Sequence, residues 1–176
     1  ISMKFLIPSA KQMSGLSDGK LVELAPASQA VLAQLVDLST EELAKFYDIS
    51  DAQAVTEAER WQALAAGKAA SYPAMDLYDG LMYRQFKPVL KSDKSRDFAS
   101  QHVLIATSLY GLIAANALIA PHRLDFMKSF KVNGKSLKAY WKSQYDESIS
   151  VNPDEVLVSL LSSEFEQVFS PTIRRR

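Results

Sequence analysis

The chain of 176 residues contains no cysteine and only two histidines, and these shortages exclude several classes of chemistry. Without cysteine there is no disulfide partner, no thiolate zinc site, no iron–sulfur cluster and no cysteine nucleophile. His102 and His122 are too few for a multi-histidine metal site. We therefore expect neither a metal nor another cofactor.

Long apolar runs are also missing, because no stretch reaches the roughly 18 residues that a membrane-spanning helix needs. A membrane partner is therefore not expected. No charged leader with an apolar core and a cleavage site is present, which favours a cytoplasmic location. Ile1 and Ser2 precede Met3, and we interpret them as remnants of cloning.

The composition is otherwise that of an ordinary globular protein, with 48% hydrophobic and 23% charged residues. At this length one compact core hides roughly 70% of the surface of the unfolded chain. The sequence therefore predicts a single domain over residues 3–176.

The formal net charge of zero is a cancellation between segments. Residues 1–83 carry a net charge of −5, residues 84–142 carry +8, and residues 143–176 carry −3. A centre of +8 is an electrostatic footprint for an anionic partner if folding gathers it on one face. If folding scatters these side chains, they are an ordinary solvated surface, and the sequence favours neither outcome.

Apolar periodicity predicts short strands and amphipathic helices in a mixed order. Buried strands are expected at residues 4–7, 102–106 and 156–158, and a half-exposed strand at 123–127. Residues 91–97 are expected to form a charged connector. Helices are expected at residues 26–38, 39–47, 52–66 and 136–149. The fold class is therefore mixed α/β (α+β), with a short central sheet, flanking helices and an N-terminal helical hairpin.

The hairpin invites comparison with helix-hairpin-helix DNA-binding modules, in which turns with glycine present backbone N–H groups to phosphate. The turn here, residues 49–54, contains no glycine, and both flanking helices are acidic. The sequence therefore favours a structural pair of helices over a phosphate clamp.

Polar side chains follow the first and the central strand, where open α/β sheets place ligand sites. Ser9 and Lys11 lie in the first of these loops, and Thr107, Ser108 and Tyr110 lie in the second. Lys11 can bind a phosphate or, if desolvated, act as a base. The hydroxyls can position a nucleotide, although Tyr110 can equally be a core aromatic residue.

Arg123 is the best single candidate for anion binding, with His122 before it and Asp125 after it. In a strand Arg123 and Asp125 would share a face, so that the carboxylate either orients the guanidinium toward a phosphate or forms a structural ion pair. Lys128 and Lys131 add positive charge to the same stretch.

Trp141 stands with Tyr140 and Tyr145 on one stripe of the predicted helix at residues 136–149, beside three lysines. The stripe is either a core face with a basic rim or a surface on which unpaired bases stack.

Known catalytic signatures are missing: there is no Ser-His-Asp order, Walker loop, GxGxxG or HExxH. The acid/base groupings that remain are Thr107 with Lys11 and His122 with Asp125.

Several segments resemble, in order, the YaaA family of peroxide stress and DNA-associated proteins. FLIPSAKQM is similar to the family's first strand and Ser-Pro-Ala-Lys loop, and APHRLDF to its Pro-Tyr-Arg-Leu-Glu segment. The family's Leu-Ser-Gly-Leu-Tyr-Gly motif falls on residues 106–111, and its aromatic pair falls on Tyr140 and Trp141. The resemblance implies a YaaA-like fold and a role in peroxide stress.

The chain also departs from the family pattern. The family's Arg-Pro-Leu-Asp reads Ala-Ala-Asn-Ala at residues 114–117, and its Gly-Asp pair reads Gly80-Leu81. Family members also continue beyond the point at which this sequence stops, so we expect a divergent or C-terminally shortened member.

These observations lead to one principal hypothesis and two alternatives. The principal hypothesis is a peroxide stress protein that binds DNA non-specifically through a basic cleft, rather than an enzyme. The first alternative is a nucleobase- or nucleotide-processing enzyme that uses Lys11, Thr107, Tyr110 and Arg123. The second is a degenerate scaffold that has lost its site.

Overall fold

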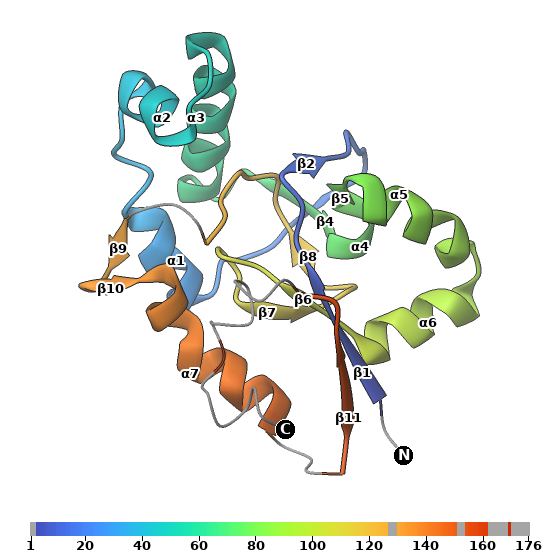
Figure 1. The fold of residues 1–176 in the computed structure, drawn as a ribbon. Coiled ribbons are helices and arrows are strands. Elements are labelled where there is room, and N and C mark those ends of the chain that lie inside the picture. The colour runs from blue at the N-terminus through green and yellow to red at the C-terminus, as the bar shows by residue number, and fades with distance from the viewer. Residues whose placement is uncertain (1–2, 127–129, 151–153, 162–168, 170–176) are drawn as a thin grey trace.

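The computed structural model describes residues 3–126, 130–150, 154–161 and 169. It is a mixed α/β protein built on a four-stranded central sheet, with further small sheets beside it (Figure 1). The fold class that the sequence predicted is confirmed. Lys128, one of the candidate residues, lies outside the described ranges.

The central sheet has the strand order β11-β1-β6-β7. β1 lies between two parallel neighbours, with Phe5 paired to Val103 of β6 and to Val158 of β11, and β7 is antiparallel to β6. The apolar runs that predicted three buried strands form β1, β6 and β11. The bounds are β1 Met3–Pro8, β6 Val103–Ala106, β7 Leu112–Ala114 and β11 Val156–Ser159.

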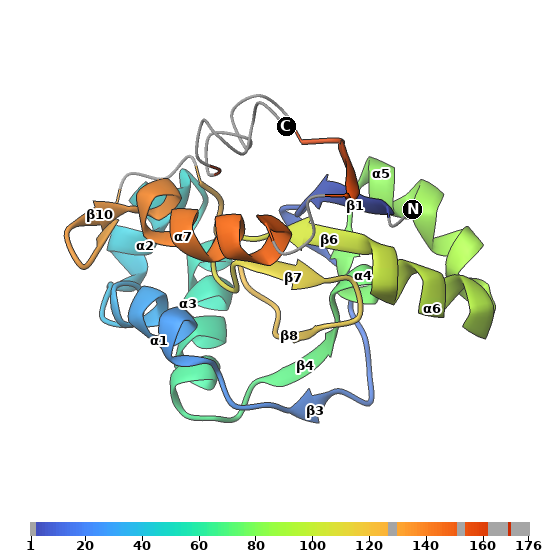
Figure 2. The ribbon, with the colours of Figure 1, turned by 90° about the horizontal axis from the view of Figure 1, so that it is seen from below.

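Two hydrophobic clusters cover the two faces of this sheet. Leu6 and Leu104 face a cluster with Trp141 and Tyr145 of α7, which spans Leu137–Ser150. Ile7 and Ile105 face the second cluster, to which the segments after β4 contribute. These segments are α4 Ala74–Leu77, α5 Leu81–Phe86, the 3-10 helix η1 Lys87–Lys91 and α6 Asp93–His102. Figure 2 shows α7 and α6 on opposite sides of the sheet.

The predicted helical hairpin is present as α2 (Thr40–Tyr47) and α3 (Asp51–Ala65), preceded by α1 (Pro26–Ala33). Ser39 and Ser50 each cap the following helix in a capping box, with Glu42 and Gln53 as the reciprocal partners. The hairpin projects from the body of the molecule beside β2 (Figure 1).

Short strands connect the remaining elements. The three-stranded sheet β3-β4-β8 and the pairs β2-β5 and β9-β10 are all antiparallel. Their bounds are β2 Gln12–Met13, β3 Lys20–Leu21, β4 Ala70–Pro73, β5 Tyr78–Asp79, β8 Leu118–Ile119, β9 Lys131–Val132 and β10 Lys135–Ser136.

Two sequence predictions of local structure were wrong. The charged stretch at residues 91–97 begins helix α6, because the Ser92 hydroxyl accepts the Ser95 N–H and Asp93 lies in the first turn. Residues 123–126 form no strand. The backbone there is held by side chains instead of a ladder, with the Arg123 carbonyl bound by Tyr47 and the Leu124 carbonyl by Ser108.

Candidate nucleic-acid interface

The loops after β1 and β6 leave the same edge of the central sheet, because Pro8 pairs with Ala106 at the end of both strands. The structure therefore brings the loop of Ser9 and Lys11 beside the turn that starts at Thr107. Lys11 is exposed there, at the carboxyl edge of a parallel pair of strands. A ligand bound at this edge of the sheet can therefore reach the Lys11 ammonium group.

The hydroxyls of the second loop are engaged by the backbone. Thr107 is fully buried, and its Oγ1 donates to the Gly111 carbonyl at 2.7 Å while accepting the Tyr110 N–H at 2.9 Å. Ser108 Oγ donates to the Leu124 carbonyl at 2.8 Å. The Tyr110 hydroxyl accepts the Ala120 N–H, and burial raises the pKa of Tyr110 to about 12. These three side chains fix the turn of residues 107–111.

Two side chains of helix α7 donate hydrogen bonds to the backbone of the same turn. Trp141 Nε1 donates to the Ser108 carbonyl at 2.7 Å, and the Tyr145 hydroxyl donates to the Thr107 carbonyl at 2.8 Å. Trp141 is only 3% exposed. Of the two readings of this aromatic stripe, the structure therefore places Trp141 in the core and not on a base-stacking surface.

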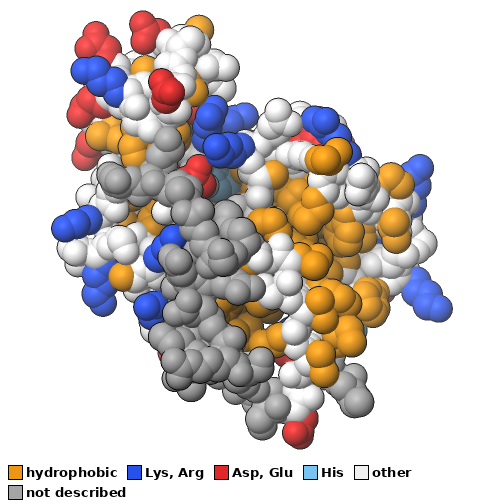
Figure 3. Space-filling view, in the orientation of Figure 1, with side chains coloured by type: hydrophobic (Ala, Val, Ile, Leu, Met, Phe, Trp, Pro, Cys, Tyr) orange, Lys and Arg blue, Asp and Glu red, His pale blue; other side chains and the backbone are white. Residues whose placement is uncertain are grey.

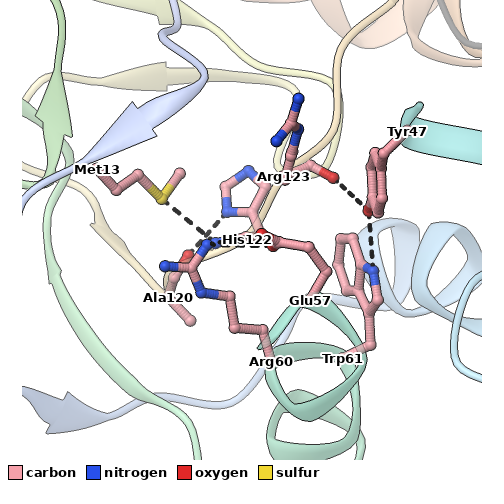
Figure 4. A network of polar contacts seen from close by, with 8 residues as sticks. All are labelled: Met13, Tyr47, Glu57, Arg60, Trp61, Ala120, His122 and Arg123. Carbon is pink, nitrogen blue, oxygen red and sulfur yellow. Dashed lines mark hydrogen bonds and ion pairs between the residues drawn. The ribbon is translucent and has the colours of Figure 1, made fainter. Parts of the chain in front are cut away.

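Arg123 lies in a cluster between the helical hairpin and residues 120–123 (Figure 4). The Tyr47 hydroxyl donates to the Arg123 carbonyl at 2.6 Å and accepts Trp61 Nε1–H at 3.0 Å. The Arg123 guanidinium carbon lies 5.5 Å from the centre of the Tyr47 ring, within cation–π range. Tyr47 therefore supports both the backbone and the charged group of Arg123.

His122 is buried at the base of this cluster. Its Nδ1–H donates to the Ala120 carbonyl at 2.8 Å, and its backbone N–H donates to Met13 Sδ at 3.3 Å. Burial, with a smaller contribution from the charge of Arg60, lowers the pKa of His122 to about 4. The imidazole is therefore neutral near pH 7. Its ring N–H is bound to a backbone carbonyl, and not to Asp125 as the predicted acid/base grouping would require.

Arg60 brings a second cation to the cluster from α3. Its guanidinium pairs with Glu57 at 3.1 Å, and in the view of Figure 4 Arg60 and Arg123 lie on either side of the His122 ring. The sequence candidates missed both members of this pair, and also Met13, Tyr47 and Trp61. One signal was available, since Glu57, Arg60 and Trp61 follow the i, i+3, i+4 spacing of one helix face.

Apart from Arg123, the basic side chains of residues 84–142 that the structure describes lie in two groups at opposite margins of the molecule (Figure 3). On α5–α6, Arg84 and Lys87 lie 3.1 and 3.9 Å from Asp79, and Arg96 lies 2.6 Å from Asp76. The second group lies on β9, β10 and α7 and consists of Lys131, Lys135, Lys138 and Lys142. Within the described part of residues 84–142, the positive charge therefore does not form one continuous surface.

The tip of the helical hairpin is acidic, and its backbone N–H groups at residues 48–50 already have hydrogen-bond partners. Asp48 adopts a left-handed conformation there (φ 55°), and the Ser50 N–H is bound by the Gln53 side chain. Asp51 begins the next helix. The carboxylates and the capped N–H groups leave this turn unsuited to hold a phosphate in the manner of helix-hairpin-helix modules.

The described ranges offer neither a metal-binding cluster nor a membrane-spanning helix. Residues 3–126, 130–150, 154–161 and 169 contain no group of three or more His, Asp or Glu side chains that could hold a metal ion. None of the helices within those ranges has the length and apolar character needed to cross a membrane.

Comparison with known proteins gives consistent matches. A family model described as "Peroxide stress protein YaaA" matches residues 3–176. A UPF0246 protein of Streptococcus thermophilus (strain CNRZ 1066) is 45% identical over 174 residues, which are 99% of this chain and 70% of that relative. A UPF0246 protein of Streptococcus pneumoniae (strain CGSP14) is 46% identical over 175 residues, which are 99% of this chain and 72% of that relative.

Proposed function

Because this chain belongs to the YaaA (UPF0246) family, we propose that it acts in the peroxide stress response by binding DNA non-specifically in the cytoplasm. The family name supports the stress role, and the cations around Arg123 that have no acidic partner among the described residues support the binding. The surface that we propose for DNA consists of Arg60, Arg123 and the lysines of β9, β10 and α7, and we call it the arginine–lysine band.

The observation that carries this proposal is the setting of Arg123. Its charge has no ion-pair partner within the described ranges, whereas Arg84, Lys87 and Arg96 on α5–α6 each have one. The Tyr47 ring supports one face of the guanidinium, which leaves the planar group of N–H donors free to bind phosphate oxygens.

The lysines of the band continue from this arginine. Phe130, which precedes Lys131, packs edge-on against Phe46 at 5.7 Å, and Phe46 neighbours Tyr47. The same helix α2 therefore holds both Arg123 and the start of β9. Lys131, Lys135 and Lys142 are exposed, and they have no acidic partner among the residues that the structure describes.

The test is a salt titration of DNA binding by fluorescence anisotropy with a labelled duplex. Each lost phosphate contact should reduce the slope of log K against log salt by about 0.9. Arg123→Ala, and Lys128→Ala combined with Lys131→Ala, should therefore weaken binding and flatten the slope. Lys91→Ala combined with Lys94→Ala removes two charges from the opposite margin and is the matched control.

Equal affinity for unrelated duplexes is expected, since phosphate contacts carry no base information. Absence of binding at low salt would overturn the DNA-binding proposal and would favour a scaffold that has lost its site. The stress role is tested separately, by the survival of a bacterium lacking its own YaaA protein after peroxide treatment, with this chain or its Arg123→Ala variant supplied.

The enzyme alternative is less well supported by the geometry. It requires Thr107 and Tyr110 to serve a substrate, whereas Thr107 Oγ1 is bound on both sides by the backbone and the Tyr110 hydroxyl accepts the Ala120 N–H. Lys11 and Arg123 are the members of that set whose side chains make no hydrogen bond within the described part of the chain. These two cations can bind an anion, but a cation alone does not provide the acid or base that a reaction would need.

A further inference from the structure

Exposed apolar side chains gather on one face of the molecule, away from the arginine–lysine band. Val89, Phe98 and Leu160 are 65%, 54% and 59% exposed, and Leu81 is more exposed still. Figure 3 shows this face as a continuous apolar patch over β1 and the α5–α6 region. Single exposed apolar residues are normal, but a contiguous patch marks an interaction site.

The patch is hollowed into a groove of about 670 Å³. Phe5 and Ile7 of β1 form its floor, and Phe86, Val89 and Phe98 form its helical wall. The polar residues that line it are Gln85, Lys94 and Ser95. A small-molecule site is apolar with a few convergent polar groups. Here Gln85 and Lys94 are exposed, and Ser95 Oγ is bound to Ser92, so the groove suits an apolar surface better than a polar ligand.

The sheet beneath the groove explains why a cover is needed. β11, β1 and β6 are parallel, and parallel sheets occur almost only with both faces covered. One face packs against α7. On the other face α6 packs against both β1 and β6. Among the described residues no helix packs over β11 there, and Val156 and its register partner Met3 are both exposed.

The relatives of this chain contain an additional segment that could cover the groove. About 30% of the length of the Streptococcus thermophilus protein lies outside its match to this chain. We propose that the groove, defined by Phe5, Ile7, Phe86, Val89 and Phe98, is the docking site for an amphipathic helix from that additional part of YaaA-family proteins. A helix laid against a parallel sheet presents an apolar stripe to it and completes the missing layer.

The experiment compares this chain with a longer form that also carries the additional part of the Streptococcus thermophilus relative, in that relative's order. Dye binding to exposed apolar surface should fall roughly threefold or more in the longer form. Val89→Asp and Phe98→Asp should lower the urea midpoint of the longer form and restore dye binding. In the 176-residue chain Val89→Asp should leave the midpoint nearly unchanged, and Phe98→Asp should lower it less than in the longer form, since it loses only the ring stacked on His102 at 4.4 Å. Leu21→Asp and Val55→Asp replace exposed apolar residues outside the groove and serve as controls.

Three results would overturn the proposal. The first is equal dye binding by the two forms. The second is a groove variant that behaves like the controls in the longer form. The third is a dimer of the 176-residue chain that Val89→Asp dissociates, because the occupant would then be a second copy. None of these measurements involves DNA, so this inference fails or stands independently of the proposed function.

Discussion

Removal of the Tyr78 hydroxyl should stabilise this protein. Tyr78 is 1% exposed, and its hydroxyl is a buried polar atom with no hydrogen-bond partner in the described part of the chain. Its ring packs against Tyr83 and His122, with centroids 5.5 and 6.4 Å away. Burial accordingly raises the pKa of Tyr78 well above its ordinary value. The hydroxyl has left water without gaining a partner.

The size of the effect follows from two opposing contributions. A buried donor without a partner costs about 1 to 3 kcal/mol of desolvation, which Tyr78→Phe removes. The void left by one oxygen atom costs about half a kcal/mol, because the ring and its contacts stay. The variant should therefore be about 1 to 2 kcal/mol more stable, which raises the Tm by roughly 2 to 8 °C in a chain of this size.

Tyr145→Phe is the matched control. Tyr145 is equally buried, but its hydroxyl donates to the Thr107 carbonyl at 2.8 Å. The same deletion there removes a hydrogen bond and leaves a buried carbonyl unpaired, so it should destabilise by about 1 to 3 kcal/mol.

Urea unfolding followed by tryptophan fluorescence measures both variants against the parent chain. Opposite shifts of the two midpoints, at an unchanged m-value, are the expected result. If Tyr78→Phe lowers the midpoint as Tyr145→Phe does, the Tyr78 hydroxyl has a partner in solution and the reasoning is refuted.

Three further substitutions test the site and its supports. The pKa of His122 is about 4 in the folded chain and about 6.5 in the unfolded chain, so the unfolded chain binds the proton more readily. The free energy of unfolding should therefore fall by about 2 to 3 kcal/mol between pH 7 and pH 4.5, and His122→Gln should flatten that part of the pH profile. Gly111 has φ +78°, and a Cβ there would lie 2.7 Å from Gln144 Oε1, so Gly111→Ala should cost about 2 to 4 kcal/mol in urea unfolding. Ser50→Ala removes the capping box of α3 and should cost about 1 kcal/mol, measured in the same way.

Each of these expectations has a clear contrary result. An unchanged pH profile in His122→Gln would place the titrating group elsewhere. Gly134 shares the φ of +78° but has open space around it, so Gly134→Ala should cost only about 1 kcal/mol. Equal losses at Gly111 and Gly134 would show that the backbone, and not the contact with α7, sets the cost. A Ser50→Ala chain as stable as its parent would mean that the hairpin needs no cap.

The sequence predicted those elements whose signal is local. β1, β6 and β11 are short β-rich apolar runs, and α2 and α3 begin at capping serines, so both kinds of element are readable from neighbouring residues. α6 was misread because its first residues are charged and its apolar side is narrow. The strand expected after His122 failed because distant side chains bind its backbone.

The candidate site was harder to predict, because its contacts join segments far apart in the chain. Tyr47, Arg60 and Arg123 meet although more than 60 residues separate the last two. A hydroxyl after a buried strand looks the same in sequence whether it serves a ligand or the backbone. Thr107 and Ser108 were candidates for the first role, and the structure gives them partners of the second kind.

The position of β1 in the sheet has a consequence for synthesis of the chain. Phe5 is synthesised before both of its partners, since Val103 and Val158 follow about 100 and 150 residues later in the chain. At about 5 to 20 residues per second, the central strand waits roughly 8 to 30 seconds for its second neighbour. The sheet therefore closes only after β11 has been synthesised, and until then the apolar side chains of β1 lack one of their two neighbouring strands.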